Sequence, residues 1–208
     1  MERSRAAMTA TAIAEGLRDQ GQNVLLLVDS LTRFARAQRE IGLAAGEPPA
    51  KGGFPPSVYT MLPRLIERAG KTYKGSITAM YTILMEGDSM SDPIADEAKS
   101  LLDGHIVLSR KLAEKAHFPA IDVLMSISRT MGNVVESDHA KLAKRVRNLL
   151  ADYKELELLL KLGEYQAGVN PESDEAVQKS PAIMKFFQQG IRDIYTLEQM
   201  LKQLESLA

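Results

Sequence analysis

The sequence of 208 residues contains no cysteine, which excludes disulfide bonds and thiolate metal sites. It also lacks a charge excess: 26 Lys and Arg against 27 Asp and Glu leave a formal net charge of -1. That balance gives no electrostatic reason to expect nucleic acid or a membrane surface as the main partner. No apolar run approaches the roughly 20 residues of a membrane span, and the charged start MERSRAAMTATAIAEG lacks the apolar core of a signal peptide. These absences predict a soluble, intracellular chain.

What is present is a globular composition, with 45% hydrophobic and 25% charged residues, in a length that suits one domain with or without an appendage. Apolar runs alternate with helical patterns through the first two thirds of the chain. We expect helices at 2–18, from about 30, near 57–70, 94–104 and 110–117, and strands at 24–28, 75–86, 105–109 and 120–129. Ser57 is expected to cap the helix that carries Leu62 and Leu65. The alternation predicts an α/β fold with a parallel sheet covered by helices on both sides.

No strand pattern occurs from Glu136 onward. Residues 137–163 read as one long amphipathic helix, Asn170 with Pro171 opens another, and Thr196 with Gln199 forms a capping box before the last. We therefore place a boundary near 134–136, between an α/β part, residues 1–135, and an all-helical domain, residues 136–208.

Asp29 follows directly on the apolar run Val24–Val28. A carboxylate at the carboxyl end of a buried parallel strand is where a nucleotide-hydrolysing sheet holds its magnesium. An acidic residue in this place is also typical of a cap on the next helix, and Asp29 followed by Ser30 fits that interpretation. Both interpretations stay open at this point.

The partner motif of such an aspartate, a GxxxxGK[ST] phosphate loop, is absent. The fragment LIERAGKT ends in Gly70, Lys71 and Thr72, but Leu65 occupies the position of the first glycine. The fragment also leads from a helix into a strand, which is the reverse of the strand–loop–helix order that cradles phosphates.

Three stretches together resemble the ATPases of type III secretion, which include the flagellar export ATPase and relate to the catalytic β subunit of rotary ATP synthases. They are LLLVDSLTRFARAQREIGLAAGEPPAKGGFPPSVYTMLPRLIERAG, SDPIADEAKSLLDGHIVLSRKLAEKAHFPAID and SISRTM. The resemblance implies a partial RecA-like (P-loop NTPase) sheet with flanking helices, followed by an all-α C-terminal domain. It also implies a hexameric motor that hydrolyses ATP with magnesium, releases export chaperones and unfolds secreted substrates.

The resemblance assigns roles to single residues. Asp29 matches the aspartate that organises magnesium through water. Arg33, in LTRF, matches a basic residue near the phosphates, or it is a helix-surface arginine. Arg129, in SISR, matches the arginine finger that reaches the γ-phosphate bound to a neighbouring subunit, or it pairs with a nearby acid.

Two aromatic residues match the family's base pocket. Phe118, in HFPAID, corresponds to a residue on which adenine stacks, and Phe186, in KFFQQG, to one that closes the pocket from the helical domain. Either residue is also compatible with a plain core position. The loop MEGDSMSDP, with Asp88 and Asp92, matches a loop that touches a central stalk, and its alternative interpretation is a solvated acidic turn.

Whole members of the family carry an N-terminal β-barrel, the phosphate loop and a catalytic glutamate upstream, so this chain resembles their C-terminal half. Alone it is expected to be inactive. The implied partners are further copies in a homo-hexamer, a coiled-coil stalk protein, a regulatory subunit, chaperone–substrate complexes and a membrane export gate, at the cytoplasmic face of the membrane; no nucleic acid is expected. Alternatives are a non-catalytic module that docks a stalk or chaperone, and a fragment of a rotary ATP synthase subunit.

The histidines and one basic run form two further patterns in the sequence. His105, His117 and His139 share no helical or strand spacing, which argues against a metal site. The basic run KLAKRVR, residues 141–147, is interpreted as a solvated helix face, with an adjacent subunit or an acidic membrane surface as other possible contacts.

Overall fold

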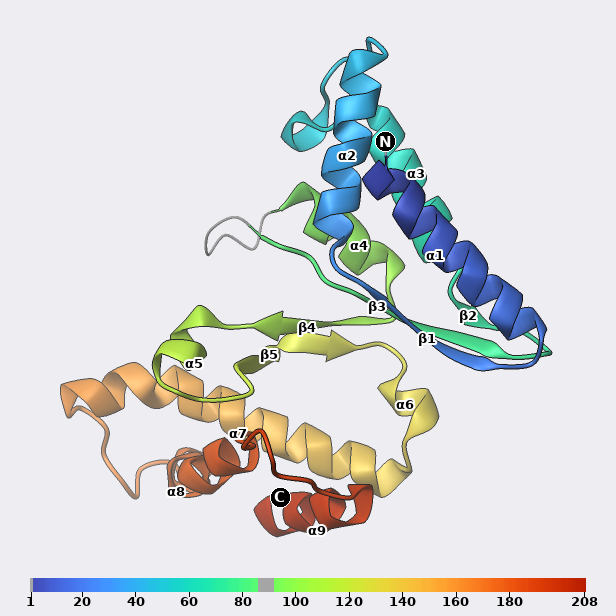
Figure 1. The fold of residues 1–208 in the computed structure, drawn as a ribbon. Coiled ribbons are helices and arrows are strands. Elements are labelled where there is room, and N and C mark those ends of the chain that lie inside the picture. The colour runs from blue at the N-terminus through green and yellow to red at the C-terminus, as the bar shows by residue number, and fades with distance from the viewer. Residues whose placement is uncertain (1, 86–91) are drawn as a thin grey trace. The chain divides into compact units, whose positions relative to one another are not determined.

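The computed structural model describes residues 2–85 and 92–208 and divides into two compact units, Met1–Leu102 and Asp103–Ala208 (Figure 1). Each unit has its own sheet and its own hydrophobic core. Within the described residues, no helix combines the length and apolar character that crossing a bilayer requires.

The first unit is built around a three-stranded sheet with the order β1-β3-β2. β1 and β3 run parallel and in continuous register from Asn23↔Ser76 to Val28↔Tyr81, whereas β2 pairs antiparallel to β3. The parallel pair confirms the parallel pairing expected for the first strands. The elements of this unit are α1 (Glu2–Asp19), β1 (Asn23–Val28), α2 (Leu31–Ala44), the 3-10 turn η1 (Lys51–Gly53), α3 (Pro56–Ile66), β2 (Gly70–Lys71), β3 (Ser76–Tyr81) and α4 (Pro93–Leu101).

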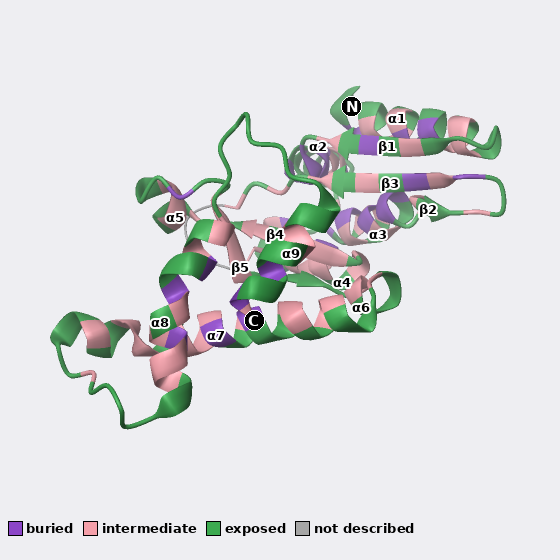
Figure 2. Ribbon diagram, turned by 90° about the horizontal axis from the view of Figure 1, so that it is seen from below, coloured by how far each residue is buried: buried purple, intermediate pink, exposed green. Residues whose placement is uncertain are grey.

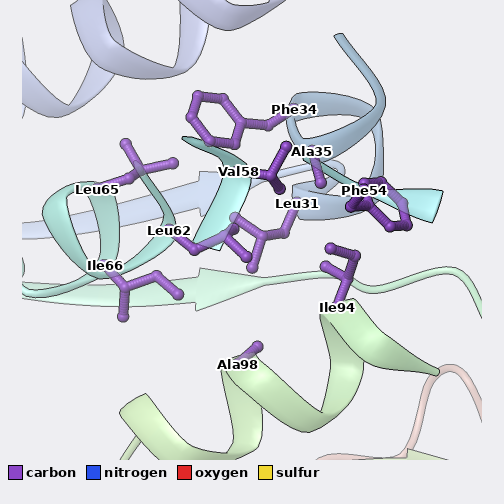
Figure 3. Packing of buried hydrophobic residues seen from close by; sticks show 10 residues of the cluster. All are labelled: Leu31, Phe34, Ala35, Phe54, Val58, Leu62, Leu65, Ile66, Ile94 and Ala98. Atoms are coloured by element: carbon purple, nitrogen blue, oxygen red, sulfur yellow. The ribbon is translucent and has the colours of Figure 1, made fainter. Parts of the chain in front are cut away.

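The main core of this unit lies where α2, α3 and α4 meet. Apolar side chains at helical spacing point toward one another from the three helices and from Phe54 (Figure 3). Leu62, Leu65 and Ile66 of α3 are all buried there. Spacing of three and four residues places these side chains on one face of the helix.

The sheet itself is covered on one face. Leu26 and Ile77 pack against Ala14 of α1, while the alternate residues Leu25 and Leu27 are 61% and 65% exposed. The expectation of a sheet covered on both sides is therefore wrong for the face that carries Leu25 and Leu27. Successive side chains of a strand point to opposite faces, and the described helices cover one of the two.

The helix α3 begins differently from the prediction. Pro55 occupies the N-cap position and Pro56 the first turn, where its fixed φ suits a helix start. Ser57 is therefore already inside the helix, and its Oγ finds no hydrogen-bond partner among the described residues. The prediction that Ser57 is the cap is wrong, because Pro55 is the N-cap and the helix starts two residues earlier than a Ser57 cap would place it.

The second unit begins with an antiparallel pair, β4 (Gly104–Leu108) and β5 (Ile121–Ser128). A parallel arrangement was expected, and it is wrong for this pair. The connection holds only the five-residue helix α5 (Arg110–Glu114). Such a helix rises about 7–8 Å, whereas β4 is about 17 Å long, so α5 is too short to return the chain to the same end of a sheet.

The rest of this unit is helical, as predicted: α6 (Met131–Val134), α7 (Ser137–Leu162), α8 (Pro171–Phe186) and α9 (Leu197–Leu207), with no strand in the described stretch 136–208. Asn170 accepts hydrogen bonds from the amides of Glu172 and Ser173, and Thr196 with Gln199 forms the expected capping box. The buried face of the bundle consists of Val146, Leu149, Ala176, Ile183, Leu204 and Leu207 (Figure 2).

The basic run 141–147 is not simply a solvated face. Arg145 pairs with Glu175 of α8 at 2.5 Å, and the half-buried Arg147 donates hydrogen bonds to backbone carbonyls of β5. The sequence interpretation is wrong for Arg147, because its partners lie on a strand that is remote in the sequence, whereas Arg145 is exposed and forms its ion pair at the surface.

Candidate functional site

Asp29 lies at the carboxyl end of β1, beside the carboxyl end of the parallel strand β3. The hydroxyl of Thr82 donates a hydrogen bond of 3.0 Å to Oδ1 of Asp29. The backbone of Thr82 continues the ladder, with its amide bonded to the carbonyl of Val28 and its carbonyl accepting from the amide of Leu31. The exposed carboxylate of Asp29 is thus held on a rigid edge, where open α/β sheets bind their ligands.

The capping interpretation of Asp29 is wrong. The N-cap of α2 is Ser30, whose Oγ accepts a hydrogen bond from the amide of Arg33 at 3.3 Å and whose side chain is buried. The peptide bond between Asp29 and Ser30 is cis. With the helix end satisfied by Ser30, the carboxylate of Asp29 is not used for capping.

Arg33 lies in the first turn of α2, four residues after Asp29 and in the same unit. Its neighbours Phe34 and Ala37 are buried in the core, whereas Arg33 is exposed. The structure therefore brings Asp29 and Arg33 to the same end of β1 and α2.

Arg129 follows the last residue of β5 and is exposed. Its backbone amide donates a 2.7 Å hydrogen bond to the carbonyl of Asp103, which extends the β4–β5 ladder by one bond. The arginine is therefore carried on a paired strand end rather than on a loose loop.

Phe118 and Phe186 lie on two neighbouring segments of the second unit. The side chain of Phe118 is 54% exposed. The segment that follows α8 runs beside it: the amide of Gln189 donates to the carbonyl of Phe118 at 2.9 Å, and Nε2 of Gln188 lies 3.3 Å from Nδ1 of the buried His117. Phe118 thus offers an open ring face next to the end of α8.

Phe186 itself is shared between the core and the surface. It packs against the buried cluster of the helical bundle, and its ring centroid lies 5.5 Å from that of Phe187. It also lines a pocket of about 590 Å³ between the end of α8 and α9, together with Tyr195 and Met200. Phe186 is therefore in part a core residue, because one side of it packs on the bundle, and in part a pocket residue.

The acidic loop is described only at its end. Asp88 lies outside the described residues. Asp92 is the N-cap of α4, with Oδ1 accepting from the amides of Ile94 and Ala95 at 2.9 and 2.8 Å. Its carboxylate thus caps the start of α4. The sequence pattern DPIA, with Asp before Pro, is the signal that indicates this cap.

The exposed carboxylate of Asp29, held by Thr82, is a kind of ligand that magnesium takes. Within the described residues, no group of three or more His, Cys, Asp or Glu is arranged to hold a metal ion. Mg²⁺ usually keeps several waters and takes one or two carboxylates together with substrate phosphates. A single exposed carboxylate, fixed by Thr82, fits that kind of site.

Thr82 is the site residue that sequence reasoning missed. It directly follows β3 (Ser76–Tyr81), which pairs in parallel with the strand that ends before Asp29. A polar side chain at the end of an adjacent parallel strand is the signal that points to it.

Comparisons with known proteins agree with these observations. Residues 1–128 match the ATP synthase alpha/beta family, nucleotide-binding domain, and residues 135–206 match the T3SS EscN ATPase C-terminal domain. A type 3 secretion system ATPase from Pseudomonas syringae pv. tomato is 64% identical over 201 residues, which cover 97% of this chain and 45% of that protein.

Two solved structures of a relative superpose closely. The assembled ATPase EscN from the enteropathogenic E. coli type III secretion system gives a TM-score of 0.94 at 55% identity, over 97% of this chain and 49% of that chain. EscN in complex with its central stalk EscO gives 0.90 at 53% identity, over 99% and 49%. The chain thus spans about half the length of the relatives it matches, and the likeness confirms the expected fold class.

Two family matches in succession cover nearly the whole sequence, and the first extends past Leu102 into the second compact unit. The chain therefore belongs to the ATP synthase alpha/beta family and, within it, to the type 3 secretion ATPases.

Proposed function

We propose that this chain is the carboxyl-terminal half of a hexameric protein-export ATPase that couples ATP hydrolysis to chaperone release and substrate unfolding. The observation that carries the proposal is the placement of Asp29. Its carboxylate is held by Thr82 at the carboxyl edge of a parallel strand pair, while Ser30 takes over the capping of α2. A carboxylate freed from capping at this edge has the position that a magnesium-organising aspartate needs.

The remaining residues divide the work of nucleotide handling. Asp29 would hold magnesium through water, and Arg33 would offer positive charge near the phosphates. Arg129 stabilises the charge that develops on the γ-phosphate held by a neighbouring subunit, a task that suits a planar, permanently charged guanidinium. Phe118 stacks on adenine with its exposed face, and Phe186 closes the base pocket from the helical domain. Magnesium, when bound, neutralises charge on the phosphates.

The proposal extends to the division of the chain and to its partners. Residues 1–135 form part of the ATPase core and residues 136–208 the helical domain, a division supported by family matches that end at 128 and begin at 135. The proposed partners are other copies in a hexamer, a coiled-coil stalk, a regulatory subunit, chaperone–substrate complexes and a membrane export gate, on the cytoplasmic side. The relative solved with its central stalk supports the stalk partner.

A second candidate is a docking function of the helical domain that is independent of nucleotide. The connection between α8 and α9 exposes apolar side chains, with Ile191 and Ile194 106% and 88% exposed. Exposed apolar residues gathered on one segment are typical of protein contact sites. Variants of these two isoleucines that lose binding of a stalk or chaperone but keep ATP turnover separate this function from catalysis.

The change Arg129→Ala in the assembled ATPase tests the proposed catalytic role. We expect turnover to fall by about 10³–10⁵-fold, while nucleotide affinity changes far less, because the finger acts mainly in the transition state. Steady-state hydrolysis and equilibrium binding of a fluorescent ATP analogue measure the two effects. Arg110→Ala, an exposed arginine of the same unit, is the control. Near-normal turnover of assembled Arg129→Ala would remove Arg129 from this role.

The chain of 208 residues alone is expected neither to bind Mg-ATP tightly nor to hydrolyse it. Backbone amides and the lysine of a phosphate loop provide most phosphate recognition, and this sequence has no such loop. Isothermal titration calorimetry checks this. Binding of Mg-ATP with a micromolar dissociation constant would contradict the expectation that these 208 residues lack the phosphate site.

A further inference from the structure

The strand β5 carries a large bulge shortly before Arg129. Asp122 pairs with Val107 and Ile127 pairs with His105, so residues 123–126 of β5 lie opposite the single residue Ile106 of β4. The backbone groups of these bulged residues are lost from the ladder. Their carbonyl oxygens need other hydrogen-bond donors.

Arg147 of α7 supplies most of these donors. Its Nη1 donates to the carbonyl of Val123 at 2.5 Å and to that of Ser126 at 3.2 Å, and its Nη2 donates to the carbonyl of Leu124 at 3.3 Å. The remaining carbonyl, of Met125, lies 3.1 Å from Nε2 of His105. One side chain of the helical bundle therefore satisfies three of the four bulge carbonyls.

The bulge is also closed within itself. The amide of Met125 donates to Oδ1 of Asp122 at 3.0 Å, and the hydroxyl of Ser126 donates to the carbonyl of Asp122 at 2.7 Å while accepting from the amide of Val107 at 2.9 Å. These hydrogen bonds tie the bulged residues to Asp122 and to β4.

An arginine is the residue that this geometry requires. The planar guanidinium presents several N–H groups in a fixed arrangement, whereas a lysine ammonium is a point charge on a flexible stem. The preceding residue, Val146, is buried in the core of the bundle, which fixes the rotation of α7 and the direction of Arg147.

We propose that Arg147 is a positioning residue for Arg129. Ser126, one of its three acceptors, lies three residues before Arg129, and the strand end is held on its other side by the bond from the Arg129 amide to Asp103. Arg147 thereby fixes the strand that carries the finger to the helical bundle. This inference rests on the proposed function of Arg129.

The change Arg147→Gln in the assembled ATPase is the first test. Displacement of a catalytic group by about 1 Å can reduce a rate about 100-fold, so we expect kcat to fall by roughly 10- to 100-fold with little change of KM for ATP. Arg147→Lys keeps the charge but not the set of donors, and is expected to restore only part of the rate. Arg145→Gln, which breaks the Arg145–Glu175 pair on the same helix, is the matched control and should keep its turnover.

A double-mutant cycle separates positioning from a general loss of structure. In the Arg129→Ala background, Arg147→Gln should cause no further loss of kcat, because its effect acts through Arg129. An equal loss in both backgrounds would overturn the proposal.

Hydrogen exchange on this chain gives a readout that does not depend on catalysis. Arg147→Gln should speed the exchange of the amides of 125–129, including the Arg129 amide, while amides in the middle of α8 keep their protection. Unchanged exchange and unchanged kcat would show that Arg147 positions nothing. Accelerated exchange together with normal turnover of Arg129→Ala would show instead that the anchor exists and that the catalytic role of Arg129 fails.

Discussion

Glu15 and Arg68 form a two-contact ion pair that fixes α1 to the segment after α3. Nε of Arg68 donates to Oε1 of Glu15 at 2.9 Å, and Nη2 donates to Oε2. Both side chains are only about a quarter exposed, at 27% and 28%. The hydrogen bonds from Arg68 lower the pKa of Glu15, and the same bonds raise the pKa of Arg68. Because α1 covers the sheet, this pair also stabilises the strand that ends at Asp29.

The change Glu15→Gln is expected to lower the free energy of unfolding at pH 7 by about 1 kcal/mol. A carboxyl group whose pKa is lowered by folding stabilises the protein above its usual pKa of about 4.3, and this contribution disappears as the pH falls through the lowered value. The difference from the unchanged protein should therefore vanish in strong acid. Urea denaturation at a series of pH values measures it, with Glu40→Gln on α2 as an exposed control. A difference independent of pH would mean that the carboxylate charge is not involved.

Among the elements, the starts of the last two long helices, α8 and α9, were predicted correctly. Asn170 and the Thr196–Gln199 box were found because capping involves residues only two or three positions apart. The antiparallel pairing of β4 with β5 and the bulge before Arg129 were not found. The pairing and the bulge depend on which segments, distant in the sequence, lie side by side in the fold, and a local sequence pattern does not contain that information.

In the candidate site, too, residues with a local sequence signal were predicted and residues that depend on long-range contacts were not. Asp29 was located from the apolar run that precedes it, whereas its partner Thr82 lies 53 residues away and was missed. Arg147 was interpreted as solvated because its acceptors are backbone carbonyls of another element, which have no signature in the sequence of α7. Residue types indicated the chemistry, but long-range contacts decided what each side chain does.

The helix α7 owes its place to the few apolar side chains that it buries. Leu149 is 1% exposed in the bundle core, while Leu158 on the same helix is 65% exposed. Leu149→Ala removes buried methyl groups and leaves a cavity, which is expected to lower the free energy of unfolding by about 2–5 kcal/mol.

Chemical denaturation followed by circular dichroism tests this expectation, with Leu158→Ala as the matched control within about 0.5 kcal/mol of the unchanged protein. Equal effects of the two substitutions would show that α7 is not held by the face that carries Leu149.

At the scale of the whole chain, the edge strand β1 and the helical bundle differ in how completely their apolar side chains are covered. β1 is an edge strand of its sheet and exposes Leu25 and Leu27. An uncovered apolar edge strand is open to local unfolding or to pairing with another chain. The bundle of α7, α8 and α9 has a closed core with capped helices.

We therefore expect the amides of 24–28 to exchange much faster than those in the middle of α7, and their protection to rise with protein concentration if copies pair through β1. Hydrogen exchange with mass spectrometry at several concentrations measures both effects. Protection of 24–28 equal to that of α7, at all concentrations in a monomer, would show that the half-sheet is self-sufficient.

The last helix, α9, stays bound to the bundle because the exposed connection from α8 attaches it covalently. α9 has 11 residues and buries only Leu204 and Leu207. A helix of that length is marginal in water by itself. Covalent attachment keeps it near its groove at a high effective concentration, of the order of millimolar for a short linker. A single backbone cut near Ile191 or Ile194 would turn this contact into bimolecular binding, and α9 would then be lost on dilution, together with one wall of the pocket that Phe186 lines.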